Sequence, residues 1–301
     1  MDGMFSELSV LLRRAIDLVL RVTDDDEPWT TPWQHSQAGA ELEAEEARRP
    51  EPETGSWPWL LAPMVARWAL WVGVEESKAL QVAVDPESTS YGADVLCRAV
   101  LESLSLGWWL LDPDIDAAGR LSRILLYRWH TASQTHNAIR HLGLGSEEDR
   151  SEYGELPEEV EKEARELGFP LRYKKTDGRR QRTCQEQVWP SYTERAAALV
   201  SNIWPQHKLP YAALSMVAHA ELLGLTRNLG RLQADAVTNL RLIRDPTEMW
   251  FWHDTYLAAG ALVLSAERAA VFLGLQEQLT ALLAAKTEIQ QALEVLRPNP
   301  T

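Results

Sequence analysis

The sequence predicts an all-α protein, an irregular bundle of about seven or eight helices with two long polar loop regions. Apolar residues recur at helical spacing through most of the chain. No run alternates apolar and polar residues as a half-buried strand does, and only the stretch 236–243 has an extended character. Two strongly polar segments, at about 23–57 and 144–190, interrupt the helical pattern.

The first expected helix covers residues 4–22, where Phe5, Leu8 and Leu12 begin one apolar face. The segment 23–57 then combines acidic runs with several prolines, and this composition predicts a flexible loop. A second helix resumes near Trp59 and continues to about residue 84, before Asp85-Pro86.

The next expected helix, 89–111, is apolar on nearly every side, which is typical of a helix at the centre of a bundle. The helix 114–143 is amphipathic. Its polar stripe contains Arg120, Arg123, Tyr127 and His130, and we expect that stripe to be solvated.

The polar segment 144–190 predicts an irregular region with one short helix at 158–167. Helical spacing returns in four further segments, 191–203, 210–228, 246–273 and 275–296. The chain thus divides into an N-terminal helix (1–22), an acidic flexible loop (23–57) and a helical bundle domain (58–301) with a polar insertion at about 144–190.

The net charge of −14 and the isoelectric point near 5.0 make nucleic acid an unfavourable general partner. A local basic run, Lys174 to Arg182, is expected to be a solvated, mobile loop. No segment resembles a signal peptide, and the apolar runs are shorter than a membrane span needs, so we expect no membrane partner and a cytoplasmic location. The chain has 13 tryptophans, which suit helix packing or a pocket for an apolar or cationic ligand.

No metal site is predicted. The two cysteines, Cys97 and Cys184, lie far apart, and Cys97 is expected to be a buried apolar residue. The run Asp24-Asp25-Asp26-Glu27 is similar to the metal-binding aspartates of class I terpene cyclases, but the second metal motif of that family is missing from the sequence. No motif identifies a cofactor, so the cofactor stays unknown.

Several polar residues occupy positions where the helical pattern requires apolar ones. Arg98 and Glu102 lie one turn apart on the central helix, and His136 and Arg128 fall within the apolar stripe of the helix 114–143. Buried charges must be paired or must bind a ligand. We therefore weigh structural ion pairing and core packing against ligand binding or proton transfer at these positions.

A third polar group, Tyr211, Ser215 and His219, occurs at successive turns of the expected helix 210–228. The three side chains would face one interior space. Ser and His can also bond to carbonyls of their own helix, so the spacing alone is compatible with a purely structural role.

Arg123 and His130 have a spacing that resembles the Arg-x4–6-His motif of the HEPN ribonucleases, which are small helical bundles. Ile124 stands where that family has a polar residue, and a solvated helix face is the preferred interpretation of the pair.

A wider resemblance rests on Arg98-Ala-Val-Leu-Glu102, Trp109-Leu-Leu-Asp112-Pro113 and Tyr211-x-x-Leu214-Ser215-x-x-x-His219. These segments resemble a family of all-helical proteins that is common in actinobacteria and has no established activity. The resemblance covers about 90–275 and implies an all-α fold and one shared site, without implying a reaction.

The leading hypothesis is a protein that binds a small organic ligand in an interior pocket lined by tryptophans, with or without catalysis. Arg98, Trp109, Arg128, Tyr211 and Ser215 would bind the ligand, and His219, His136 and Glu102 would be the catalytic candidates. The alternatives are a metal-independent ribonuclease of HEPN type and a non-catalytic protein-interaction module. A homodimer through the last two helices is also considered.

Overall fold

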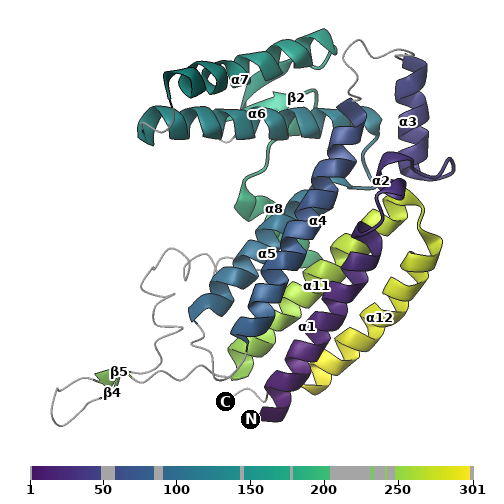
Figure 1. The fold of residues 1–301 in the computed structure, drawn as a ribbon, viewed down its shortest axis with the longest axis vertical. Helices are drawn as coiled ribbons and strands as arrows, with labels where there is room; N and C mark the ends of the chain where they lie inside the picture. The colour runs from purple at the N-terminus through teal and green to yellow at the C-terminus, as the bar shows by residue number, and fades with distance from the viewer. Residues whose placement is uncertain are drawn as a thin grey trace. The chain divides into compact units, whose positions relative to one another are not determined.

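The computed structural model describes residues 2–48, 58–84, 91–142, 146–176, 179–203, 232–233, 241–242 and 248–298. These residues contain ten helices and only short strands, which confirms the predicted all-α fold (Figure 1). Seven of the expected helices occur close to their predicted bounds. They are α1 (Asp2–Thr23), α4 (Pro58–Ala83), α5 (Tyr91–Leu110), α6 (Ala117–Leu142), α8 (Tyr192–Ile203), α11 (Glu248–Leu273) and α12 (Gln276–Val295). The expected helix 210–228 lies outside the described residues.

The chain forms two compact units. Unit 1 comprises Met1–Ala40, Met64–Leu111 and Ser191–Thr301, and unit 2 comprises Glu41–Pro63 and Asp112–Pro190. Unit 2 is therefore inserted twice into the sequence of unit 1, so that the segments of unit 1 come from distant parts of the chain.

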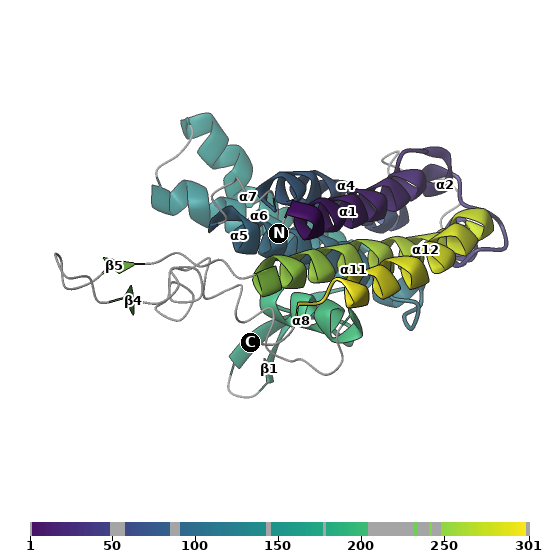
Figure 2. The same cartoon turned by 90° about the horizontal axis from the view of Figure 1, so that it is seen from below.

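Unit 1 is built around α11, which packs against α1, α5 and α12 (Figures 1 and 2). The apolar face predicted for the N-terminal helix is the buried one, since Leu8 and Leu12 of α1 are fully buried. The ring of Phe5 meets Phe251 of α11 edge to face at 5.2 Å. Arg14 of α1 pairs with Glu288 of α12 on the outside of the same layer.

Helix α11 is long and apolar enough to cross a membrane, so the expectation that no segment reaches that length is wrong for Met249–Leu273. Of its most apolar window, 67% is buried inside the protein. Leu257, Leu262 and Ala266 are among its fully buried residues. Such burial is typical of the core helix of a bundle.

Helices α4 and α5 approach each other closely because small residues lie between them. A Cβ atom on Gly107 of α5 would lie 3.0 Å from the carbonyl oxygen of Ala66 and 3.6 Å from the Cβ of Ala69. On α4, a Cβ on Gly73 would overlap the side chain of Leu104. The outer face of α4 then carries apolar side chains that the described residues leave exposed.

The segment 23–57 is not simply a flexible loop, because it contains α2 (Glu27–Thr30) and α3 (Gln37–Arg48). Two of its acidic residues, Glu41 and Glu45, are buried at 6% and 7% exposure. Within unit 2, Glu41 accepts hydrogen bonds from the guanidinium of Arg120 on α6, with Nε–Oε2 at 2.9 Å. This long-range ion pair holds an acidic segment that its composition alone would leave unfolded.

The segment 144–190 is also more regular than predicted. Helix α7 covers Glu147–Glu166, well beyond the expected 158–167, and packs along α6. Its buried residues, Val160 and Ala164, are few, which explains why its charged sequence did not show a helical pattern over its whole length.

A three-stranded antiparallel sheet follows α7, in the order β1-β2-β3. The strands are β1 (Leu171–Thr176), β2 (Arg179–Cys184) and β3 (Gln187–Val188), and Tyr173 pairs with Arg182 in the first hairpin. The mobile loop expected for the basic run is therefore wrong. A second pair of strands, β4 (Leu232–Gln233) and β5 (Arg241–Leu242), overlaps the stretch 236–243 only in part.

Candidate functional site

Arg98 and Glu102, two of the predicted site residues, form an ion pair on α5. Nε of Arg98 donates to Oε1 of Glu102 at 2.6 Å, and the two side chains are 19% and 26% exposed. Trp109, half-buried, lies two turns further along the same helix. The pair is partly withdrawn from water, as the sequence predicts, and each charge compensates the other.

A third ionisable residue, Glu76 of α4, lies beside this pair. Burial raises the pKa of Glu76, a hydrogen bond with Ser103 opposes that change, and the charge of Glu102 adds to it. Oε2 of Glu76 is buried, and the described residues provide no hydrogen-bond partner for it. The sequence does not single out Glu76, because Glu75-Glu76 has the pattern of a solvated acidic pair. Only the packing of α4 on α5 shows that Glu76 is withdrawn from water while Glu75 is exposed.

The remaining predicted site residues are not brought together with this pair by any described contact. Arg128 and His136 lie on α6 in unit 2, where Nη1 of Arg128 donates to Oε1 of Glu163 on α7 at 2.7 Å. Tyr211, Ser215 and His219 fall outside the described residues. Of the predicted interior site, the structure therefore places only the Arg98–Glu102 pair and Trp109 on one helix.

The polar stripe of α6 is not the solvated face that the sequence predicts. Arg120 and Arg123 are buried, at 1% and 8% exposure. Arg123 donates to Oε1 of Gln187 at 2.9 Å and to Oδ2 of Asp112 at 3.1 Å. Desolvation lowers the pKa of Arg123, and the neighbouring Asp112 opposes this effect.

His130, the second residue of the HEPN-like pair, is half-buried and stacks on the indole of Trp189, with ring centroids 4.6 Å apart. Tyr127 of the same stripe also contacts Trp189, at 6.1 Å. The contacts of Arg123 and His130 thus fix α6 to the segment around β3, which is a structural role for both residues.

A pocket with two tryptophan walls lies between the end of α1 and the first half of α4. Its volume is about 550 Å³, within the range of small-molecule sites, and its lining is Thr23, Asp24, Arg67, Trp68, Trp71 and Val72. Trp68 and Trp71 are 70% and 53% exposed, so their indole rings form an accessible surface. The sequence predicts a tryptophan-lined pocket, but this one lies on the outer face of α4 and not in the interior beside Arg98.

Arg67 connects the two helices that form this pocket. Its Nε donates to the carbonyl oxygen of Thr23 at 2.7 Å, and its guanidinium also pairs with Asp26. The guanidinium therefore caps the C-terminal end of α1, where unsatisfied carbonyls carry a partial negative charge. The exposed carboxylate of Asp24 lines the pocket beside this helix end.

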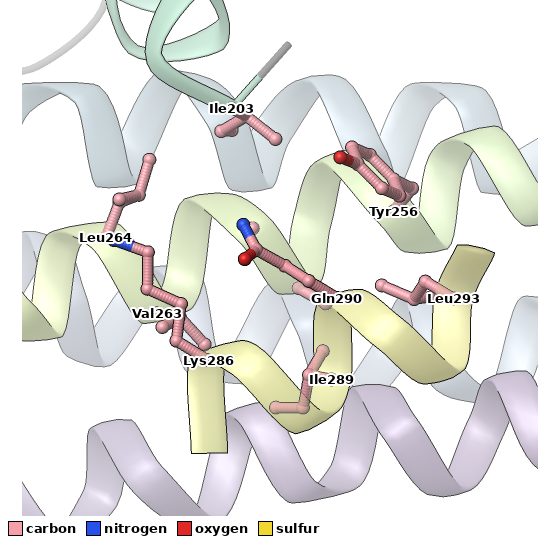
Figure 3. A pocket seen from close by; sticks show the side chains of 10 residues that line it. Ile203, Tyr256, Val263, Leu264, Lys286, Ile289, Gln290 and Leu293 are labelled. Atoms are coloured by element: carbon pink, nitrogen blue, oxygen red, sulfur yellow. The ribbon is translucent and has the colours of Figure 1, made fainter. Parts of the chain in front are cut away.

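A second cavity, between α11 and α12, is too narrow for an organic ligand (Figure 3). It holds about 20 Å³, which is enough for roughly one water molecule. Figure 3 shows Tyr256, Gln290 and Leu293 along its wall. Burial raises the pKa of Tyr256, with a further increase from Glu294.

Within the described ranges, no group of three or more His, Cys, Asp or Glu side chains is arranged to hold a metal ion. Cys97 and Cys184 are both buried and are not in a disulfide, and burial raises the pKa of Cys184. A raised pKa keeps a thiol protonated and unreactive. Cys184 therefore does not have the surroundings of a catalytic nucleophile.

No protein-family profile, curated protein or solved structure matches the chain. The pocket at Trp68 and Trp71 has a size and a lining that suit a ligand. The cluster of Glu76, Arg98 and Glu102 contains a buried carboxylate oxygen, Oε2 of Glu76, for which the described residues provide no hydrogen-bond partner.

Proposed function

We propose that the protein binds a small organic ligand in the pocket at Trp68 and Trp71, and that this ligand carries a positively charged ammonium group. The observation that carries the proposal is the pair of exposed indole rings beside the exposed carboxylate of Asp24. A cation is attracted to the face of an indole ring, and pockets of this kind recognise alkylated ammonium groups.

The charges of the pocket favour a cation over an anion. Among the described residues, Arg67 is the one cationic side chain of the lining, and its guanidinium already binds the carbonyl of Thr23 and the carboxylate of Asp26. An anionic ligand would have to compete with both contacts. A cation instead meets the exposed carboxylate of Asp24, which attracts positive charge.

The expected affinity is modest. A cation–π contact at an exposed site contributes about 0.5–1 kcal/mol and an exposed carboxylate up to about 1 kcal/mol. Two indoles with one carboxylate therefore give about 2–3 kcal/mol, or a dissociation constant on the order of 10 mM for the simplest ammonium compounds. The natural ligand would gain affinity from apolar atoms that contact Val72 and the stems of the tryptophans.

The test is a titration with choline, followed by thermal unfolding and by tryptophan fluorescence, next to its neutral isostere 3,3-dimethyl-1-butanol and to sodium chloride. At ten times its dissociation constant, choline should add about 1.4 kcal/mol of stability. Trp68→Leu, Trp71→Leu and Asp24→Asn should each weaken binding. Trp33→Leu is the matched control, because Trp33 is also an exposed indole, at 66%, but does not line the pocket. Equal effects of choline and its neutral isostere would refute the cationic class of ligand, and no effect of either would refute the pocket.

A second candidate is a protein-interaction module, as the sequence analysis also considered. It is favoured by the exposed apolar side chains of α4, which are Met64, Trp68, Trp71, Val72 and, beyond the exposed Glu75–Lys78 ion pair, Val82. An exposed apolar surface of this kind can bind the same surface of a second copy of the chain. Sedimentation equilibrium tests this candidate: a dimer that dissociates in Val82→Glu supports it, and a monomer at all concentrations refutes it.

Catalysis by Glu102, His136 or His219 stays a prediction, and so does the HEPN-type alternative. Both are separable from the ligand proposal, because their described residues, Glu102, His136, Arg123 and His130, do not line the pocket. Glu102→Gln should leave choline binding unchanged, and this variant therefore distinguishes the α4 pocket from the site at Arg98.

A further inference from the structure

The pocket at Trp68 and Trp71 lies beside a run of four acidic residues. Asp24 lines the pocket, and Asp25, Asp26 and Glu27 follow it directly, all four with exposed side chains. Consecutive Cα atoms are about 3.8 Å apart, so the Cα atoms of the run lie within about 10 Å of that of Asp24. This span is roughly one Debye length at 0.1 M salt, so all four negative charges act on an ion in the pocket, whichever way each side chain points.

The positive charges around this run are fewer. Arg67 pairs with Asp26, whose side chain is still 79% exposed, and Arg21 is exposed in the last turn of α1. Glu75 and Lys78 on α4 pair with each other and add no net charge. Four carboxylates against two guanidinium groups leave a local charge of −2. A ligand with a single ammonium group would neutralise only half of this charge.

The two indole rings of the pocket are spaced for a pair of cations. Trp68 and Trp71 are three residues apart on α4, and the Cβ atoms of such residues are about 5–6 Å apart on one face of a helix. Two ammonium groups joined by four methylene groups are also about 6 Å apart, at bond lengths near 1.5 Å. Each ammonium group can therefore face one ring, while the methylene chain lies over the apolar surface that includes Val72.

We propose that the ligand of this pocket is a polyamine, a linear aliphatic chain with two or more ammonium groups. The inference rests on the proposed function and specifies the class of its ligand. Primary and secondary ammonium groups also donate charge-assisted hydrogen bonds to a carboxylate such as Asp24, which a quaternary ammonium group cannot do. The net charge of −14 attracts such polycations toward the protein from solution.

Tryptophan fluorescence of the full-length protein tests the proposal with putrescine and n-butylamine, which share a four-carbon chain but carry two ammonium groups and one. An exposed ion pair increases affinity by at most about fivefold. At an ionic strength of about 20 mM, where screening is weak, putrescine should therefore bind roughly two to five times more tightly than n-butylamine. Magnesium chloride supplies the charge of putrescine without its carbon chain, and it should not reproduce the fluorescence change.

Glu27→Gln tests the contribution of the acidic run. The interaction of two unit charges about 10 Å apart in water corresponds to on the order of twofold in affinity. The same change in potential acts on both charges of putrescine, so the variant should weaken n-butylamine about twofold and putrescine about fourfold. The matched control is Glu7→Gln, because Glu7 is also exposed but lies about 25 Å from Asp24 along α1. The control should leave both affinities unchanged.

Two results would overturn the polyamine proposal and leave the proposed function standing. Equal affinities for putrescine and n-butylamine would show that the pocket responds to one cation only. Equal effects of magnesium and putrescine, with choline still bound, would show that the acidic run attracts any dication. Failure of the proposed function is a different result, in which neither choline nor putrescine binds.

Discussion

The buried ion pair between Glu41 and Arg120 provides the sharpest test of the structure. Glu41→Gln removes the negative charge but keeps the shape, and it takes from the guanidinium of Arg120, at 1% exposure, the carboxylate that accepts its Nε hydrogen bond. The neutral carbonyls of Asp112 and Ile115 stay among its acceptors. Breaking a buried pair on one side costs about 3–5 kcal/mol. An exposed pair contributes no more than about 1 kcal/mol.

Hydrogen exchange read by mass spectrometry measures this difference locally, in peptides from α3 and α6. Glu41→Gln should expose α3 to exchange with a free-energy loss of about 3–5 kcal/mol, and Glu41→Leu/Arg120→Met should recover much of that loss, because no unpaired charge is left buried. The control is Glu288→Gln, which breaks the exposed pair with Arg14, at 57% and 46% exposure. If Glu41→Gln costs no more than Glu288→Gln, then Glu41 is not buried against Arg120 and α3 does not belong to unit 2.

Three further outcomes follow from packing, capping and titration. Gly107→Val should destabilise the protein by about 1–3 kcal/mol in urea unfolding, because the Cβ position is already 3.0 Å from the backbone oxygen of Ala66. Ser191→Ala should cost about 1 kcal/mol and increase exchange in the first turn of α8, because Ser191 and Glu194 cap each other there. Glu76→Gln should stabilise the protein at neutral pH and not below pH 4, measured by urea unfolding at both pH values. Burial raises the pKa of Glu76 in the folded state. The contribution of Glu76 to the free energy of unfolding is therefore fully present in acid, where its carboxyl group is protonated, and is lost as the pH rises through the folded pKa.

Most helices could be predicted from the sequence because their burial pattern is local. The apolar spacing of α1 and the Asp-Pro pair after α5 mark helices whatever they pack against. The ordered parts of the two polar segments depend on distant partners instead. α3 is held by Arg120, and the hairpin is held by the contact of Arg182 with Trp129, so neither shows an apolar pattern.

The sequence predicts a pocket lined by tryptophans but not its position on α4. Thirteen tryptophans suit helix packing or a ligand pocket, and periodicity assigns Trp68 and Trp71 to a helix without saying which face is covered. The partial burial of Arg98 and Glu102 follows from an apolar helix and could be predicted. The burial of Arg123 could not be predicted from the sequence, because its hydrogen-bond acceptors, Asp112 and Gln187, lie outside its own helix.

Unit 1 is assembled from three segments that are far apart in the sequence, and this has a consequence during protein synthesis. Helix α1 packs on α11 and α12, which the ribosome makes only after about 225 further residues. At typical elongation rates this delay lasts about 10 to 45 s, during which the apolar face of the nascent α1 has no permanent partner. Unit 2, from Asp112 to Pro190, is complete well before then. We therefore expect newly made chains to need a chaperone for α1, and truncation before α11 to give insoluble protein.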